Sequence, residues 1–321
     1  MSGAAPARRP PPVPSEFAAA YAHCERVARE HYENFPVASR LLPAAMRPHV
    51  AAVYAFARAA DDFADEGTLA PAERYRLLDD WKARLHAPPP PASSSDPSDR
   101  VFAAVAQTRC LCELDIQLFD DLLSAFRQDV ETRRYAEWAG VLDYCRRSAN
   151  PVGRLVLGIA GHRGRDVEQA SDSLCTALQL ANFWQDFGVD YRRGRIYLPA
   201  EVSGRRRAQE GDLAAGVWTE AWRDAFAEAV RRTRVLFDQG RRVLTDDHLE
   251  LVLHRQPVTV SDHLGQLVAG VDVHERERDV AEERFARQPQ EHGRILADRP
   301  EHAQPFEVPE CLAEDVDALL F

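Results

Sequence analysis

The sequence predicts an all-α fold of packed helices. Apolar residues recur at helical spacing through most of the chain, whereas the alternating pattern of strands is scarce. The 321 residues are 45% apolar, which is enough to bury a sizeable core in one large helical domain or two average ones.

The expected elements follow one another along the chain. Residues 1–14, rich in Pro, Ala and Arg, are expected to form a disordered lead-in. Folding should begin near Ser15, which we take as an N-cap. Prolines divide the helical stretch that follows, and these are Pro36, Pro43 and Pro48. The later helices are expected at 101–127, 138–160, 167–189 and 218–244, with a loop at 87–98 and a non-helical Arg/Gly-rich segment at 192–199.

Composition disfavours several classes of function. The net charge of -11 argues against a nucleic-acid partner and means that an anionic substrate needs local cations. No apolar run approaches the roughly 20 residues that span a bilayer, and nothing resembles a signal peptide. The six cysteines lack metal-ligand spacing. We therefore expect reduced thiols and a cytoplasmic protein that makes at most peripheral contact with a membrane.

A polar stripe interrupts an otherwise apolar stretch of predicted helix. Its four members recur at intervals of four, three and four residues, so they share one helical face. They are Tyr54, Arg58, Asp61 and Asp65, with Asp62 beside them. An acidic cluster of this kind, taken alone, is more often a surface feature.

A second stripe makes that surface interpretation the weaker one. It recurs at intervals of three, four and four residues in a helix that is otherwise aromatic and aliphatic. Its members are Gln179, Asn182, Asp186 and Asp190. Two buried-looking helices therefore both carry oxygen ligands.

These ligands indicate a metal-bound diphosphate. Carboxylates in an apolar cavity repel one another and lose hydration, so they need bound cations. Mg²⁺ takes one or two carboxylates and completes its shell with water and phosphate oxygens. Arg58, Arg193 and Arg195 can add positive charge, and departure of pyrophosphate would leave an allylic cation. The aromatic candidates for the cavity wall are Phe35, Phe56, Phe183, Trp184 and Phe187.

Taken together, four motifs are similar to those of the squalene/phytoene synthase family. They are His31-Tyr-Glu-Asn-Phe-Pro36, the run from Tyr54 to Glu66, Tyr144-Cys145, and the run from Gln179 to Asp190 followed by Arg193 to Pro199. The resemblance extends over residues 15–240. It implies the all-α isoprenoid synthase fold, a helical bundle in which both Asp motifs face a central active-site cavity.

The resemblance also implies roles for particular residues. The positions that match Mg²⁺ ligands are Asp61, Asp65, Asp186 and Asp190, with Asp62 as a supporting catalytic carboxylate. The substrate-binding candidates are His31, Asn34, Phe35, Tyr54, Arg58, Tyr144, Ser148, Asn150, Gln179, Asn182, Arg193, Arg195 and Tyr197.

Within the family, the segments 33–39, 149–153 and 183–186 are most similar to the hopanoid-pathway branch. That branch converts presqualene diphosphate to hydroxysqualene by ionisation, cyclopropane rearrangement and water capture. Ser148 and Asn150 are polar where the family is generally more apolar, so they are candidates to hold the water. The sequence Asn150-Pro151 equally suits a helix break. The implied partners are presqualene or farnesyl diphosphate and other isoprenoid-pathway enzymes.

Other interpretations stay open. The enzyme could condense two prenyl diphosphates head to head into presqualene diphosphate, squalene or phytoene. An inactive helical scaffold could retain the motifs, although it would not need Arg and Tyr beside the carboxylates. A di-metal carboxylate bundle would require Glu-x-x-His pairs, which are missing. No Gly-x-Gly-x-x-Gly motif supports reduction by NADPH.

The C-terminal segment departs from the family. Residues 241–321 do not match its closing helices, and five prolines cut the segment into short pieces. This pattern indicates either divergence or translation from a shifted reading frame.

Overall fold

The computed structural model describes residues 10–30, 42–65 and 67–244. These residues form helices and no β-strand, apart from one isolated bridge, which confirms the all-α prediction. The helices are η1 (Ser15–Phe17), α1 (Ala18–Glu30), α3 (Arg47–Asp65), α4 (Pro71–His86), α5 (Pro97–Cys112), α6 (Ile116–Asp129), α7 (Trp138–Ser148), α8 (Asn150–Ile159), α9 (Arg165–Gln185), α10 (Phe187–Arg192), α11 (Ala200–Arg205), α12 (Glu210–Ala214) and α13 (Glu220–Leu244).

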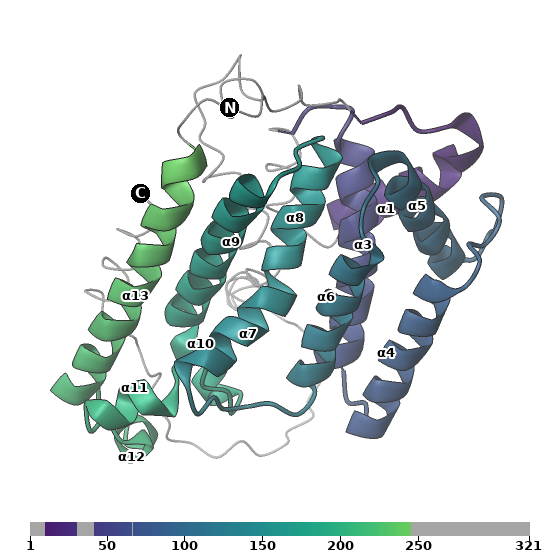
Figure 1. Ribbon diagram of the computed structural model, residues 1–321. Helices are drawn as coiled ribbons and strands as arrows, with labels where there is room; N and C mark the ends of the chain where they lie inside the picture. The colour runs from purple at the N-terminus through teal and green to yellow at the C-terminus, as the bar shows by residue number, and fades with distance from the viewer. Residues whose placement is uncertain (1–9, 31–41, 66, 245–321) are drawn as a thin grey trace, which may run out of the picture.

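The helices pack as a row with two hydrophobic cores. Along the row α13 contacts α9, α9 contacts α8, α8 contacts α6 and α6 contacts α3 (Figure 1). The first core joins α1, α3, α4, α5, α6 and α8, while the second joins α7 with α9 to α13. The first Asp motif therefore belongs to one core and the second motif to the other.

Close packing around α3 fixes the direction of its polar stripe. Phe56 is fully buried and packs edge-on against Phe102 and Phe119, with ring centroids 6.0 and 5.3 Å away. Small residues such as Ala52 and Ala60 let the neighbouring helices approach. Phe56 is thus part of the first core, and the opposite side of α3 carries the carboxylates.

Three predicted helices are each divided in two. Glu113, with a left-handed φ of 50°, separates α5 from α6. A break at Ala149 separates α7 from α8, as the Asn150-Pro151 pair allows. Asp186 lies between α9 and α10. The predicted N-cap at Ser15 is wrong, because Ser15 begins a 3₁₀ turn and makes no capping hydrogen bond.

Some expectations lie outside the described residues. These include most of the lead-in and all but residues 241–244 of the C-terminal segment. Within the described ranges, no helix is long and apolar enough to cross a membrane. The five cysteines that the structure describes are free thiols.

The contact between α8 and α9 depends on Gly153. A Cβ there would lie 2.5 Å from Cys175 Sγ and would overlap Ser171 Oγ, and both of these side chains are fully buried. Gly153→Ala should therefore lower the free energy of unfolding by about 1–3 kcal/mol. The midpoint of urea unfolding measures the change.

Gly204→Ala provides the matched control. Nothing lies within 4 Å of a Cβ at Gly204, so its stability should be unchanged or raised by up to about 1 kcal/mol. Equal destabilisation by the two substitutions would contradict the packing argument.

Candidate functional site

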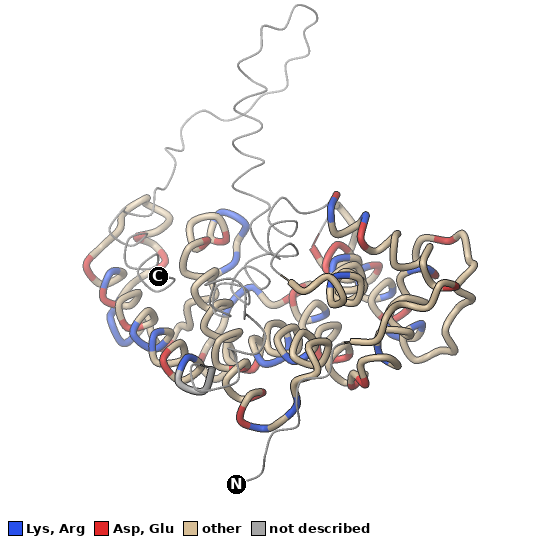
Figure 2. The backbone as a smooth tube through the Cα atoms, turned by 90° about the horizontal axis from the view of Figure 1, so that it is seen from above, with Lys and Arg blue, Asp and Glu red and all other residues tan. Residues whose placement is uncertain are grey.

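Positive charge for an anionic ligand must come from a local arginine cluster. Acidic and basic positions are interspersed along the described helices (Figure 2), so their charges partly offset one another over long range. Arg58 on α3 is such a local cation. Its Nη2 lies 2.6 Å from Asp62 Oδ1 and its Nη1 lies 3.4 Å from Asp61 Oδ2, with only 11% of the side chain exposed. The Arg58 guanidinium thus forms ion pairs with two carboxylates.

Tyr54 stands one turn before Arg58 and is mostly buried. Burial raises the pKa of its phenol to about 12; Arg58 opposes the rise, and the charges of Asp61 and Asp62 add to it. The phenol therefore stays protonated near neutral pH and can donate a hydrogen bond.

The second stripe keeps its register across a break that the sequence analysis missed. Asp186 has φ -90° and ψ 6° at the junction of α9 and α10. Even so, its N–H donates to the Asn182 carbonyl and the Asp190 N–H donates to the Asp186 carbonyl, both at 2.9 Å. The buried Asn182 Nδ2 has no hydrogen-bond partner among the described residues, and Gln179 is half-buried one turn earlier.

An ion pair joins the first motif to the segment that follows the second. The guanidinium of Arg195, which follows the second motif, donates to the Asp65 carboxylate at the end of the first. Burial alone would raise the pKa of Asp65, but the hydrogen bond and charge of Arg195, with the charges of Arg193 and Arg133, hold that pKa below its ordinary value. Asp65 is therefore ionised at neutral pH.

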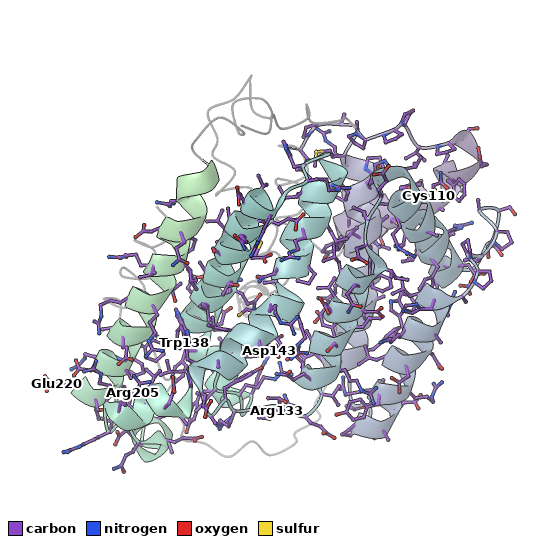
Figure 3. All side chains as sticks on the ribbon, in the orientation of Figure 1. Cys110, Arg133, Trp138, Asp143, Arg205 and Glu220 are labelled. Carbon is purple, nitrogen blue, oxygen red and sulfur yellow. The ribbon has the colours of Figure 1, made fainter. Side chains whose placement is uncertain are left out.

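Two extended segments hold Arg195 in place. The Ile196 N–H donates to the Arg133 carbonyl at 3.0 Å, and Arg134 and Ile196 form a parallel bridge. Gly194, with φ 78°, turns the chain after α10, and its carbonyl accepts from the Arg134 guanidinium. Arg133 is labelled at the lower end of the bundle in Figure 3, the opposite end from Cys110.

Aromatic rings continue from these segments into the second core. Tyr197 stacks on Phe183 with centroids 3.8 Å apart and planes 4° from parallel. The centroid of the Tyr144 ring lies 6.2 Å from that of Tyr197 and 6.0 Å from that of Phe183. Trp184 is fully buried and donates to Thr233, and Phe187 packs against Phe226, so these two candidate wall residues belong to the core.

Asp129 is a buried carboxylate that the sequence analysis missed. It accepts the Tyr144 hydroxyl hydrogen bond at 2.7 Å and lies close enough to Arg195 to raise the pKa of that guanidinium. Burial and the charge of Asp129 both raise the pKa of Tyr144. A signal existed in the sequence, because Asp129 falls three residues after Phe126 on the apolar face of α6.

The two polar residues at the α7–α8 break have different surroundings. Asn150 Oδ1 accepts from Thr176 Oγ1 at 2.9 Å, so this oxygen serves the α8–α9 contact. Ser148 Oγ is buried and makes no hydrogen bond with any described residue. The remaining candidates, His31, Asn34 and Phe35, lie outside the described residues.

The donor set suits Mg²⁺ that arrives with a phosphate ligand. Among the described residues, no three His, Cys, Asp or Glu side chains gather closely enough to hold a metal ion by themselves. The carboxylates of α3 are instead balanced by Arg58 and Arg195. Mg²⁺ needs only one or two carboxylates when phosphate and water complete its octahedron, so these residues fit that mode of binding.

Comparisons with known proteins relate the chain to prenyl diphosphate chemistry. The family model described as squalene/phytoene synthase matches residues 28–269, past the position where the sequence analysis ends the resemblance. A hydroxysqualene synthase from Zymomonas mobilis is 40% identical over 210 residues, which cover 65% of this chain and 68% of that protein. A 15-cis-phytoene synthase from Synechococcus elongatus is 31% identical over 246 residues, which cover 73% and 78%.

A solved structure agrees with these sequence matches. The crystal structure of squalene synthase HpnC from Alicyclobacillus acidocaldarius superposes with a TM-score of 0.68 at 36% identity. The alignment covers 83% of this chain and 96% of that chain. The isoprenoid synthase fold expected from the motifs is thereby confirmed.

The pKa of Asp65 predicts how its ion pair responds to pH. Because that pKa is below the ordinary 3.8, the stabilisation is complete above 3.8 and is lost as the pH falls through the folded-state pKa. A double-mutant cycle of Asp65→Asn and Arg195→Gln should give a coupling of about 1 kcal/mol or less near pH 7, because Asp65 is partly exposed, and the coupling should decline only below about pH 4. Urea unfolding at several pH values measures it.

The exposed Arg76–Asp80 pair on α4 serves as the control. Its coupling should be smaller and should vanish in high salt. A coupling between Asp65 and Arg195 that does not change with pH would contradict the assignment of this ion pair.

Proposed function

Because the chain belongs to the squalene/phytoene synthase family, we propose that it ionises a prenyl diphosphate, converting presqualene diphosphate and water to hydroxysqualene and diphosphate. The similarity to the Zymomonas mobilis hydroxysqualene synthase, at 40% identity against 31% for the Synechococcus elongatus phytoene synthase, supports this choice of product.

The observation that carries the proposal is the contact between Arg195 and Asp65. It joins residues 130 positions apart and brings the end of the first acidic motif to the cationic segment that follows the second. Arg58 adds a second guanidinium beside the carboxylates of α3. A metal-bound diphosphate needs both signs of charge in one place, since carboxylates hold the metal and guanidinium groups bind phosphate oxygens.

Bound Mg²⁺ would stabilise the negative charge that develops on the departing pyrophosphate. The residues that would hold it are Asp61, Asp65, Asp186 and Asp190, with Asp62 in support. On this proposal Arg58, Arg193 and Arg195 bind and orient the phosphate oxygens. The protonated phenol of Tyr54 and the amides of Gln179 and Asn182 donate further hydrogen bonds to the substrate.

The aromatic rings protect the carbocation from premature capture. Tyr197 and Phe183 stack face to face, and the faces of aromatic rings attract cations. The Tyr144 hydroxyl donates to Asp129, and its raised pKa keeps it protonated. This phenol is therefore a poor nucleophile and positions the wall of the site.

Ser148 is the better of the two candidates for holding the captured water. Its hydroxyl is buried without a hydrogen-bond partner in the described part of the chain, which a bound water would satisfy. The Asn150 oxygen already accepts from Thr176. We assign water placement to Ser148 and packing of α8 on α9 to Asn150.

Head-to-head condensation of two prenyl diphosphates is the second candidate function. The match to a 15-cis-phytoene synthase over 73% of the chain favours it. Both reactions begin with ionisation of a diphosphate, so the product distinguishes them.

The test is incubation with presqualene diphosphate and, separately, with farnesyl diphosphate, followed by identification of the products. We expect hydroxysqualene from presqualene diphosphate in the presence of Mg²⁺ and none in excess chelator. Asp61→Asn and Asp186→Asn should each lower kcat by about a hundredfold or more while the helical circular dichroism is retained.

Two results would contradict this assignment. Conversion of two farnesyl diphosphates to presqualene diphosphate and diphosphate, with no turnover of added presqualene diphosphate, would favour condensation. Full activity in chelator, or in both Asp variants, would exclude the metal-assisted mechanism.

Replacing Ser148 should change the product more than the rate of ionisation. Ser148→Val should lower the yield of hydroxysqualene, relative to hydrocarbon by-products, by about fivefold, the effect of losing one hydrogen bond of about 1 kcal/mol. Release of diphosphate should continue, because no predicted metal ligand is changed. Ser173→Val, at an exposed hydroxyl on α9, is the matched control. An unchanged alcohol fraction in Ser148→Val would show that the water is held elsewhere.

A further inference from the structure

Two extended segments lie side by side next to α10, and their geometry determines where Arg133 points. Arg134 and Ile196 are paired in a parallel bridge, in which the Ile196 N–H donates to the Arg133 carbonyl at 3.0 Å. Successive side chains of an extended segment point to opposite faces. The side chains of Arg133 and Arg195 therefore share the face opposite to that of the bridged pair.

Ring packing identifies this face independently. Tyr135 and Tyr197 are the next residues of the same parity, and their rings stack with centroids 5.9 Å apart and planes 26° from parallel. Arg195, which precedes the bridged Ile196 and lies on the same face as Tyr197, forms the ion pair with Asp65. Arg133 is thus placed on the side of the segments that faces the end of α3.

Arg134 points the other way and has a structural task. Its guanidinium donates to the Gly194 carbonyl and pairs with Glu210 at 2.6 Å. Arg133, in contrast, is exposed and forms no ion pair with any described residue.

We propose that Arg133 is a further diphosphate-binding residue, which with Arg193 and Arg195 forms a cationic rim around the end of α3. The inference rests on the proposed function, since the rim would take the diphosphate of the same substrate. Arg195 must divide its hydrogen bonds between Asp65 and the ligand, whereas the guanidinium of Arg133 can turn wholly to phosphate oxygens. Arg133 therefore strengthens substrate binding.

The test is calorimetric titration of the full chain with inorganic pyrophosphate in the presence of Mg²⁺. Arg133→Gln should weaken pyrophosphate binding by about three- to tenfold, and Arg133→Lys, which keeps the charge, by less. In Arg133→Gln, the KM for presqualene diphosphate should rise by a larger factor than kcat falls. Arg146→Gln removes an exposed arginine that pairs with Asp143 on α7 and should leave the affinity unchanged.

The outcomes separate this inference from the proposed function. Equal affinity of wild type and Arg133→Gln would overturn the role of Arg133, while turnover of presqualene diphosphate by wild type would leave the proposed function intact. An equal loss in Arg146→Gln would also overturn it, because the effect would then be that of net charge. If wild type binds no pyrophosphate and turns over neither substrate, both proposals fail.

Discussion

The ion pair between Arg195 and Asp65 is the contact on which the arrangement of the site depends. The two hydrophobic cores carry their acidic motifs on separate helices. Arg195 reaches Asp65 at the end of α3 because the bridge at Ile196 and the turn at Gly194 orient its backbone toward that helix. The backbone of a short irregular segment thus determines where Arg195 meets the first motif.

The Arg195–Asp65 ion pair also offsets the repulsion among the carboxylates. Several carboxylates near an apolar interior would repel one another and would take up protons if no cation were present. Arg58 and Arg195 supply that charge, and Asp65 consequently stays ionised at neutral pH. On the proposed function, binding of Mg²⁺ and a diphosphate exchanges these partners: the carboxylates turn to the metal and the guanidinium groups to the phosphate. The charge of the carboxylates is therefore balanced by guanidinium groups before binding and by Mg²⁺ after binding.

The sequence analysis predicted most of the fold because helical periodicity is a local pattern. The polar stripes of α3 and α9 stood out against apolar neighbours, and the family resemblance named their residues. The break at Asp186 was not predicted, since the hydrogen bonds from Asn182 to Asp190 continue through it and the spacing stays helical. Arg133 carried no signal, because its position follows from a bridge between segments about sixty residues apart. Pairings of that kind are decided by tertiary packing.

The most direct test of this exchange of partners is the thermodynamic coupling between Mg²⁺ and pyrophosphate. Calorimetry would give the Mg²⁺ affinity of the full chain with and without pyrophosphate, corrected for the complex that the two form in solution. The account predicts weak Mg²⁺ binding alone and binding at least about tenfold tighter with pyrophosphate, a coupling of about 1.4 kcal/mol. Tight Mg²⁺ binding that pyrophosphate does not change would contradict it, because the carboxylates would then form a complete metal site by themselves.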